Sequence, residues 1–88
     1  MNAAEREQVR LSLLKYLDAH AGRRWALSES AMRLNLRNDG FQAEPNEVSA
    51  ELEYLREKGL AQIDAKVISP ENRAWRITAA GRDFFAQS

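Results

Sequence analysis

Apolar residues recur at helical spacing in the first part of the chain. They stand at positions i, i+4, i+7 and i+8, and they are Val9, Leu13, Tyr16 and Leu17. This spacing lines one face of an α-helix. Asn2 is a suitable N-cap and Gly22 a suitable C-terminal stop, so the pattern predicts a helix over 3–20. Leu11 falls on the opposite side of that helix.

A second helix is predicted over 28–38. The apolar stretch 25–27 before it could pair as an edge strand with a later hairpin. Ser28 is a favourable N-cap, and Gly40 follows the helix as its stop.

The inward face of the second helix is ambiguous. Ala31 with Leu34 fits one orientation, and Met32 with Leu36 fits another. A broad buried stripe that includes both pairs is the interpretation we favour for a helix between two others.

A third helix is predicted over 45–58. Pro45 suits the first turn of a helix, where its missing N–H costs nothing, and Gly59 ends the pattern. Val48, Leu52 and Leu55 mark the buried face. At 100° per residue, the side opposite the core carries Asn46, Ser49, Ala50, Glu53 and Glu57.

The last third of the chain predicts a β-hairpin over 60–77 and a closing helix over 79–86. Alternating apolar residues at 60–63 and 73–77 flank the turn residues 69–72. Thr78 is a suitable N-cap for the closing helix. Gly81 inside that helix suggests a close approach to another backbone, most simply that of the first helix.

The predicted elements follow the order of a winged helix-turn-helix, an α+β fold with a three-helix core, a two- or three-stranded wing and a short C-terminal helix. We expect one domain over residues 1–88, because a chain of this length has room for one modest core.

Composition limits the function more than it defines it. Thirteen Lys and Arg residues balance thirteen Asp and Glu residues, so no overall field attracts nucleic acid or an anionic membrane. Without cysteine and with one histidine, the chain cannot form a thiolate metal site or a histidine cluster. There is no run of about 20 apolar residues that could cross a membrane and no signal-peptide pattern. We therefore expect a cytoplasmic protein that binds neither membrane nor cofactor.

Catalytic chemistry is not indicated either. No motif places a nucleophile near a base, no pair of carboxylates stands out, and no glycine-rich phosphate loop is present. We expect no enzyme and no small-molecule substrate.

These motifs resemble those of a broad protein superfamily and of a narrower family. The pattern from Gly59-Leu60 through the hairpin to Thr78-x-x-Gly81 resembles the winged-helix superfamily. Together with Ser28-Glu29-Ser30 and Tyr54-Leu55, it also resembles small uncharacterised proteins of Mu-like prophages. The superfamily implies binding of double-stranded DNA through the third helix and the wing. The narrower resemblance implies a phage or prophage product of unsettled role. With DNA binding, we expect this product to regulate or organise DNA.

The candidate DNA contacts fall into two groups. The outward face of the third helix would read bases with Asn46, Ser49, Ala50 and Glu53. Basic residues beside it would hold phosphates, and these are Arg23, Arg24, Arg33, Arg37, Lys66, Arg73 and Arg76. An equally weighted interpretation is that these cations only coat the surface.

Charge on the third helix opposes this function. From Glu44 to Lys58 there are five acidic and two basic side chains, a net charge of −3. DNA carries about one negative charge per 1.7 Å, so unpaired acids near it are repulsive. For most of these acids, a solvated helix face is the simplest interpretation.

The alternative function is a protein-interaction module or a dimeric adaptor. It would use the acidic third helix and apolar side chains that the core leaves over, in contact with a phage or host protein or a second copy of the chain. The candidates are Leu11, Met32, Leu34, Leu36 and Tyr54.

Overall fold

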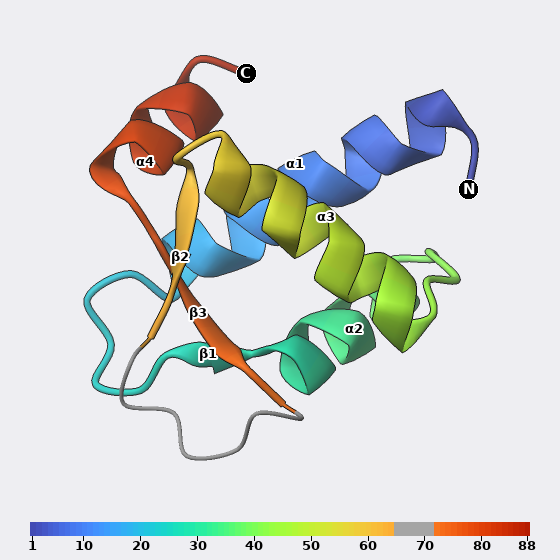
Figure 1. Cartoon of the computed structure of the whole chain (residues 1–88), viewed down its shortest axis with the longest axis horizontal. Helices are drawn as coiled ribbons and strands as arrows, with labels where there is room; N and C mark the ends of the chain where they lie inside the picture. Colours follow the sequence, from blue (N-terminus) through green and yellow to red (C-terminus); the bar gives the residue numbers. More distant parts are fainter. Residues whose placement is uncertain (65–71) are drawn as a thin grey trace.

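The structure is a computed structural model, and it describes residues 1–64 and 72–88. Within these described residues, four helices and three short strands follow one another (Figure 1). Their bounds are α1 Ala3–Ala19, β1 Leu27–Ser28, α2 Glu29–Asn38, α3 Pro45–Glu57, β2 Ala61–Ile63, β3 Ala74–Ile77 and α4 Ala79–Ala86. The ends differ from the predicted ones by at most one residue for each helix. Lys66 lies outside the described residues, and so does the predicted turn at 69–72 except for its last residue.

The strands form one antiparallel sheet in the order β1-β3-β2. Leu27 pairs with Trp75, and Ala61 pairs with Ile77. The predicted edge strand is therefore confirmed, although it covers Leu27–Ser28 and leaves Trp25 outside the sheet. Figure 1 shows the sheet at one end of the helices, crossing from α4 to the start of α2.

Side-chain caps begin three of the helices as predicted. Asn2 Oδ1 accepts from the Glu5 N–H at 2.8 Å, Ser28 Oγ from Ala31 at 3.2 Å, and Thr78 Oγ1 from Gly81 at 3.0 Å. α3 starts at Pro45 as predicted, but its cap was not predicted: Glu44 and Glu47 form a capping box there. Each cap satisfies an N–H group that the helix itself cannot bond.

The core lies where α1 packs against α2, α3, α4 and β3. Its largest completely buried side chains are Trp75, Leu13, Leu14, Leu17, Met32, Leu36, Leu52, Leu55, Val9 and Val48. The inward face of α2 is the one that carries Met32 and Leu36, whereas Leu34 is 55% exposed. The broad stripe expected on α2 was wrong, because only one side of this short helix reaches α1 and α3.

Gly81 lies against a different backbone from the predicted one. A Cβ atom there would lie 2.0 Å from the Leu60 carbonyl oxygen and 2.8 Å from Ile77 Cγ1. The close approach therefore joins α4 to the start of β2 and not to α1. A side chain at this position would collide with backbone, which cannot move aside as a flexible side chain can.

Glu51 also departs from expectation. Its side chain is buried on the inner side of α3, and its two carboxylate oxygens accept from Arg6 Nε at 3.1 Å and Arg10 Nε at 2.6 Å. The predicted solvated position was wrong for this residue. Two guanidinium groups on α1 compensate the buried charge, which would be costly without them.

Candidate nucleic-acid interface

The outward face of α3 is divided between free and bonded side chains. Asn46 and Ala50 are exposed near its start. Ser49 is half-buried, and its hydroxyl donates to Glu29 Oε1 at 2.5 Å. Glu53 lies one turn further along and is ion-paired. Of the predicted base-reading residues, the structure thus leaves Asn46 and Ala50 uncommitted.

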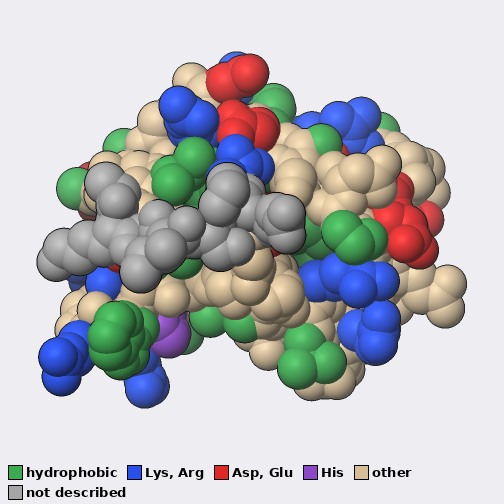
Figure 2. All heavy atoms as spheres, turned by 60° about the horizontal axis from the view of Figure 1, so that its bottom comes forward, with side chains coloured by type: hydrophobic (Ala, Val, Ile, Leu, Met, Phe, Trp, Pro, Cys, Tyr) green, Lys and Arg blue, Asp and Glu red, His purple; other side chains and the backbone are tan. Residues whose placement is uncertain are grey.

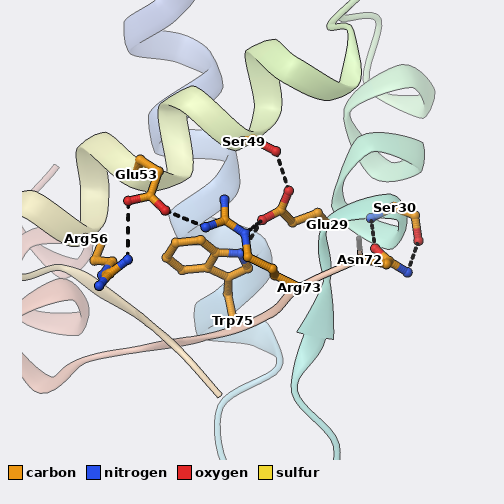
Figure 3. A network of polar contacts seen from close by, with 8 residues as sticks. All are labelled: Glu29, Ser30, Ser49, Glu53, Arg56, Asn72, Arg73 and Trp75. Carbon is orange, nitrogen blue, oxygen red and sulfur yellow. Dashed lines mark hydrogen bonds and ion pairs between the residues drawn. The ribbon is translucent and has the colours of Figure 1, made fainter. Parts of the chain in front are cut away.

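Glu29, in the first turn of α2, is the centre of a polar network that joins three elements (Figure 3). Besides Ser49 from α3, it accepts from Arg73 Nε at 2.8 Å and from the indole Nε1 of Trp75 at 2.7 Å, so both its oxygens are used. The network fixes the base of the hairpin against α2 and α3. It also gives the buried Trp75 indole the acceptor that its N–H requires.

Arg73 lies between two carboxylates. It bonds Glu29 on one side and Glu53 Oε1, at 2.5 Å, on the other. Burial alone would lower the pKa of Arg73, but the hydrogen bond with Glu53 and the charge of Glu29 outweigh it and hold that pKa above its usual value. The guanidinium is charged but already neutralised, so the structure does not present it as the free phosphate clamp that the sequence suggested.

Arg76 is used to hold backbone. Its terminal nitrogens donate to the carbonyl oxygens of Arg23 and Arg24, both at 3.1 Å, and its Nε lies 3.4 Å from Asp64 Oδ2. It links β3 to the connection between α1 and β1. This predicted phosphate clamp is therefore also occupied by intramolecular contacts.

The other described candidates for phosphate contacts lie in two separate places. Arg33 and Arg37 are on α2, where Arg33 donates to the Ala43 carbonyl oxygen at 3.1 Å and Arg37 is exposed. Arg23 and Arg24 are exposed on the connection between α1 and β1. Figure 1 shows that connection and the start of α3 at opposite sides of the molecule, and Figure 2 shows separate groups of basic side chains at two sides of one face. The predicted clamps thus do not flank α3 as one set.

The predicted partner-binding residues are also separated. Met32 and Leu36 are completely buried, so they cannot contact a partner, and this part of the alternative was wrong. Leu34 is exposed alone on α2. Leu11 and Tyr54 come together with Phe84 in a groove of 520 Å³ between α1, α3 and α4. Phe84, from α4, is half exposed.

Sequence reasoning missed the role of Glu29 and the exposure of Trp25. Glu29 was named only within a motif that carries the family resemblance, and Trp25 lay in the stretch predicted as an edge strand. Local spacing holds no signal for Glu29, since its partners are 20 to 46 positions away. Alternation would have placed Trp25 on the same face of the strand as Leu27, which packs against the core.

Two kinds of site are not found in the part of the chain that the structure describes. Its His, Asp and Glu residues form no cluster of three or more that could hold a metal ion. None of the helices in residues 1–64 and 72–88 combines the length and apolar character needed to cross a bilayer.

Solved structures share this arrangement at low sequence identity. TA0346, a proposed transcriptional regulator from Thermoplasma acidophilum, aligns with a TM-score of 0.78 and 18% identity over 98% of this chain and 81% of its own. A PadR-like transcription factor from Bacteroides fragilis gives 0.74 and 12%, over 96% and 79% of the two chains. The chain has a winged-helix fold. Bacillus subtilis PadR, crystallised with operator DNA, gives 0.69 and 14% over 91% of this winged-helix chain and 46% of its own.

No protein-family model matches the chain, and no curated protein matches it significantly. Identities below 20% bear on the fold alone. In this fold α3 is the second helix of the α2–α3 pair, and β2 and β3 are the paired strands of the hairpin.

Proposed function

We propose that this winged-helix protein is a DNA-binding regulator that places the start of α3 in the major groove. Asn46 would contact base edges, Ala50 would allow close approach, and the exposed Arg37 on α2 would contact phosphates. Helix-turn-helix proteins read bases mainly with the early residues of the second helix of the motif. The neighbour crystallised with operator DNA supports this choice.

The pairing of the acids on α3 carries the proposal. Glu51 is buried against Arg6 and Arg10, and Glu53 is paired with Arg56 and Arg73. Glu47 is used in the capping box. The net charge of −3 counted along the helix therefore overstates the repulsion that DNA would meet, because partners outside the helix neutralise part of it.

Binding to mixed duplex DNA tests the proposal. Anisotropy at about 50 and 200 mM salt should show affinity falling by orders of magnitude, since cations on phosphates release counterions. Arg37→Ala should weaken binding on all sequences and reduce the salt slope by about one. Arg82→Ala is the matched control, because it removes the same charge from α4. Absence of binding at low salt, or equal effects of the two variants, would overturn the proposal.

In this proposal, the preference of the protein for particular DNA sequences depends on Asn46. After selection of a preferred site from random duplexes, Asn46→Ala should relax discrimination at one position by about 1–3 kcal/mol, the usual value of a good base contact. A preferred site that is unchanged in this variant would remove Asn46 from the reading face. The phage or prophage association stays a prediction from the sequence resemblance.

A homodimer is the second candidate, and the groove beside Leu11, Tyr54 and Phe84 favours it. The groove exposes apolar surface between α1, α3 and α4, and Arg10 stacks over the Tyr54 ring at 3.7 Å to its centroid within it. Sedimentation should show a dimer that Phe84→Ser weakens. Leu34→Ser, an exposed apolar position outside the groove, should leave the dimer intact. A strictly monomeric protein would exclude this candidate.

A further inference from the structure

Trp25 is the most exposed large apolar side chain in the described part of the chain. It is 72% exposed and lies in the connection between α1 and β1. Tryptophan buries more apolar area than other side chains when a partner covers it, so a ring left in water is a candidate contact surface. Its neighbours along the chain are Arg23 and Arg24, both exposed.

The cations beside this ring are not neutralised. Neither Arg23 nor Arg24 pairs with a carboxylate in the described residues, although the protein as a whole has no net charge. The Arg24 guanidinium lies 5.2 Å from the centroid of the Trp25 ring. Figure 2 shows basic and hydrophobic side chains projecting together at this corner, next to the histidine. A flat ring and two free positive charges are therefore presented together.

The backbone under these side chains is held in place. Arg76 donates to the carbonyl oxygens of both Arg23 and Arg24, and the Arg23 N–H donates to the His20 carbonyl oxygen at 3.2 Å. Gly22 makes the turn with a φ of 79°, a value that other residues rarely adopt. A loop fixed in this way loses little freedom when a ligand binds to its side chains.

We propose that Arg23, Arg24 and Trp25 form a binding platform for unpaired nucleotides. The Trp25 ring would stack on an exposed base, and the two guanidinium groups would contact the flanking phosphates. A duplex does not offer this contact, because its bases are stacked on one another. The platform lies at the opposite side of the molecule from the start of α3 (Figure 1), so it adds a single-strand site to the proposed duplex site.

Intrinsic fluorescence tests this directly. The chain has two tryptophans, and the other, Trp75, is completely buried, so a strand that stacks on Trp25 quenches one separable signal. We would titrate the full chain with oligothymidylate and oligouridylate of about 12 nucleotides, within the usual site sizes. Saturable quenching by either strand supports the platform.

The affinity of each variant is measured by the fluorescence anisotropy of labelled oligothymidylate, a signal that does not come from tryptophan. Trp25→Ala should lose ~10-fold or more in affinity, whereas Trp25→Phe, which keeps a ring, should retain most of it. Arg23→Ala with Arg24→Ala should also weaken binding and flatten its salt dependence. Asn46→Ala is the control from the proposed duplex site and should leave oligothymidylate binding unchanged.

The outcomes separate this inference from the duplex proposal. Equal binding by Trp25→Ala and the unaltered chain overturns the platform, even if Arg37→Ala still weakens duplex binding. A blue shift of Trp25 emission with phosphatidylserine vesicles, without quenching by oligonucleotides, also overturns it, in favour of a membrane contact. Weaker duplex binding in Trp25→Ala with no single-strand binding would place Trp25 in the duplex interface and likewise overturn it.

Discussion

At Glu29, one carboxylate accepts hydrogen bonds from residues 20, 44 and 46 positions away in the chain. The three donors come from α3, the residue before β3, and β3 itself, so the contact is tertiary in every part. Little of its side chain is open to solvent, which makes each unmade bond costlier than at the surface. The effect of removing its charge should therefore exceed that of removing an exposed one.

Replacing Glu29 by Gln should destabilise the fold. The amide keeps one acceptor oxygen but turns an NH₂ group toward donors, so Arg73 and Trp75 lose part of their bonding. We expect a loss of about 1–3 kcal/mol in the free energy of unfolding, measured by urea denaturation. Glu57→Gln on the exposed end of α3 removes the same charge and should change it by less than about 0.5 kcal/mol. Equal effects would contradict the structural role of the network.

The contact of Tyr16 with Asp39 gives a pH dependence. The Tyr16 hydroxyl donates to Asp39, and this bond, followed by the charge of Lys15, holds the pKa of Asp39 below its usual value of 3.8. Burial and the nearby carboxylate raise the pKa of Tyr16 well above its usual value. A depressed pKa in the folded state means stability that is present above the unfolded pKa and is lost as pH falls through the folded one.

Tyr16→Phe should therefore cost less stability at acidic pH than at neutral pH. The difference in unfolding free energy between this variant and the unaltered chain should be largest at pH values above the usual pKa of Asp, 3.8, and should shrink at lower pH. Urea unfolding between pH 2 and 6 measures it. In an Asp39→Asn background the effect of Tyr16→Phe should no longer depend on pH over this range. If it still did, another titrating group would be responsible for the pH dependence.

Among the elements, α3 and α4 owe their positions to contacts at their ends and edges. The buried Glu51 of α3 pairs with Arg10 on α1, and the outward Glu53 pairs with Arg73 next to β3. α4 approaches the chain before β2 through Gly81. A helical glycine ordinarily costs about 1 kcal/mol against alanine. Here the close contact with Leu60 reverses that preference.

Gly81→Ala should destabilise the protein although alanine is the better helix former. The added methyl group would overlap the Leu60 carbonyl, and overpacking of this kind costs about 1–3 kcal/mol. Ala80→Ser, at an exposed position of the same helix, should stay within about 0.5 kcal/mol. Thermal unfolding followed by circular dichroism compares the two. A stabilised Gly81→Ala would contradict the packing of α4 on Leu60.

Glu53→Gln should strengthen binding of duplex DNA more than Glu57→Gln does. Both variants remove one negative charge from the outward side of α3, but only Glu53 bonds Arg73. Because the Glu53 side chain is partly exposed, release of the pair is worth roughly 0.2–1 kcal/mol, an additional gain of up to about fivefold in affinity. Anisotropy with the same duplex measures both. Equal gains would mean that Arg73 stays with Glu29 and does not reach DNA.

The whole molecule has one hydrophobic core, in which the first helix, α1, packs against the last, α4, as well as against the elements between them. α1 packs against α2, α3, α4 and β3, so loss of any element exposes its apolar face. A chain of 88 residues buries only a little more than roughly 60% of its unfolded surface and has small reserves of stability. We propose that residues 1–88 unfold as one unit.

Urea unfolding of the Trp25→Phe variant tests whether the chain unfolds as one unit. The remaining tryptophan, Trp75, is completely buried in the sheet, so its emission reports the core, whereas far-ultraviolet circular dichroism reports the helices. The two urea transitions should coincide with one midpoint. Replacement of the exposed Trp25 should leave that midpoint nearly unchanged. Separate transitions would divide the chain into two units.

Much of the fold was predictable because it depends on neighbours in sequence. Apolar spacing in 3–20 and 45–58 and side-chain caps at Asn2, Ser28 and Thr78 act within one or two turns. The candidate site was less predictable. Arg73 and Arg76 carry the charge expected of phosphate clamps, but distant carboxylates and carbonyl oxygens occupy them.

The order of the elements, three of the four helix caps and the winged-helix class could be predicted from the amino-acid sequence, since periodicity and capping are local properties. Which face of α2 is buried, what Gly81 touches and which charges remain free depends on how the elements pack. Those outcomes depend on pairs of residues far apart in the chain. Their distances are set by packing, and no local pattern encodes them.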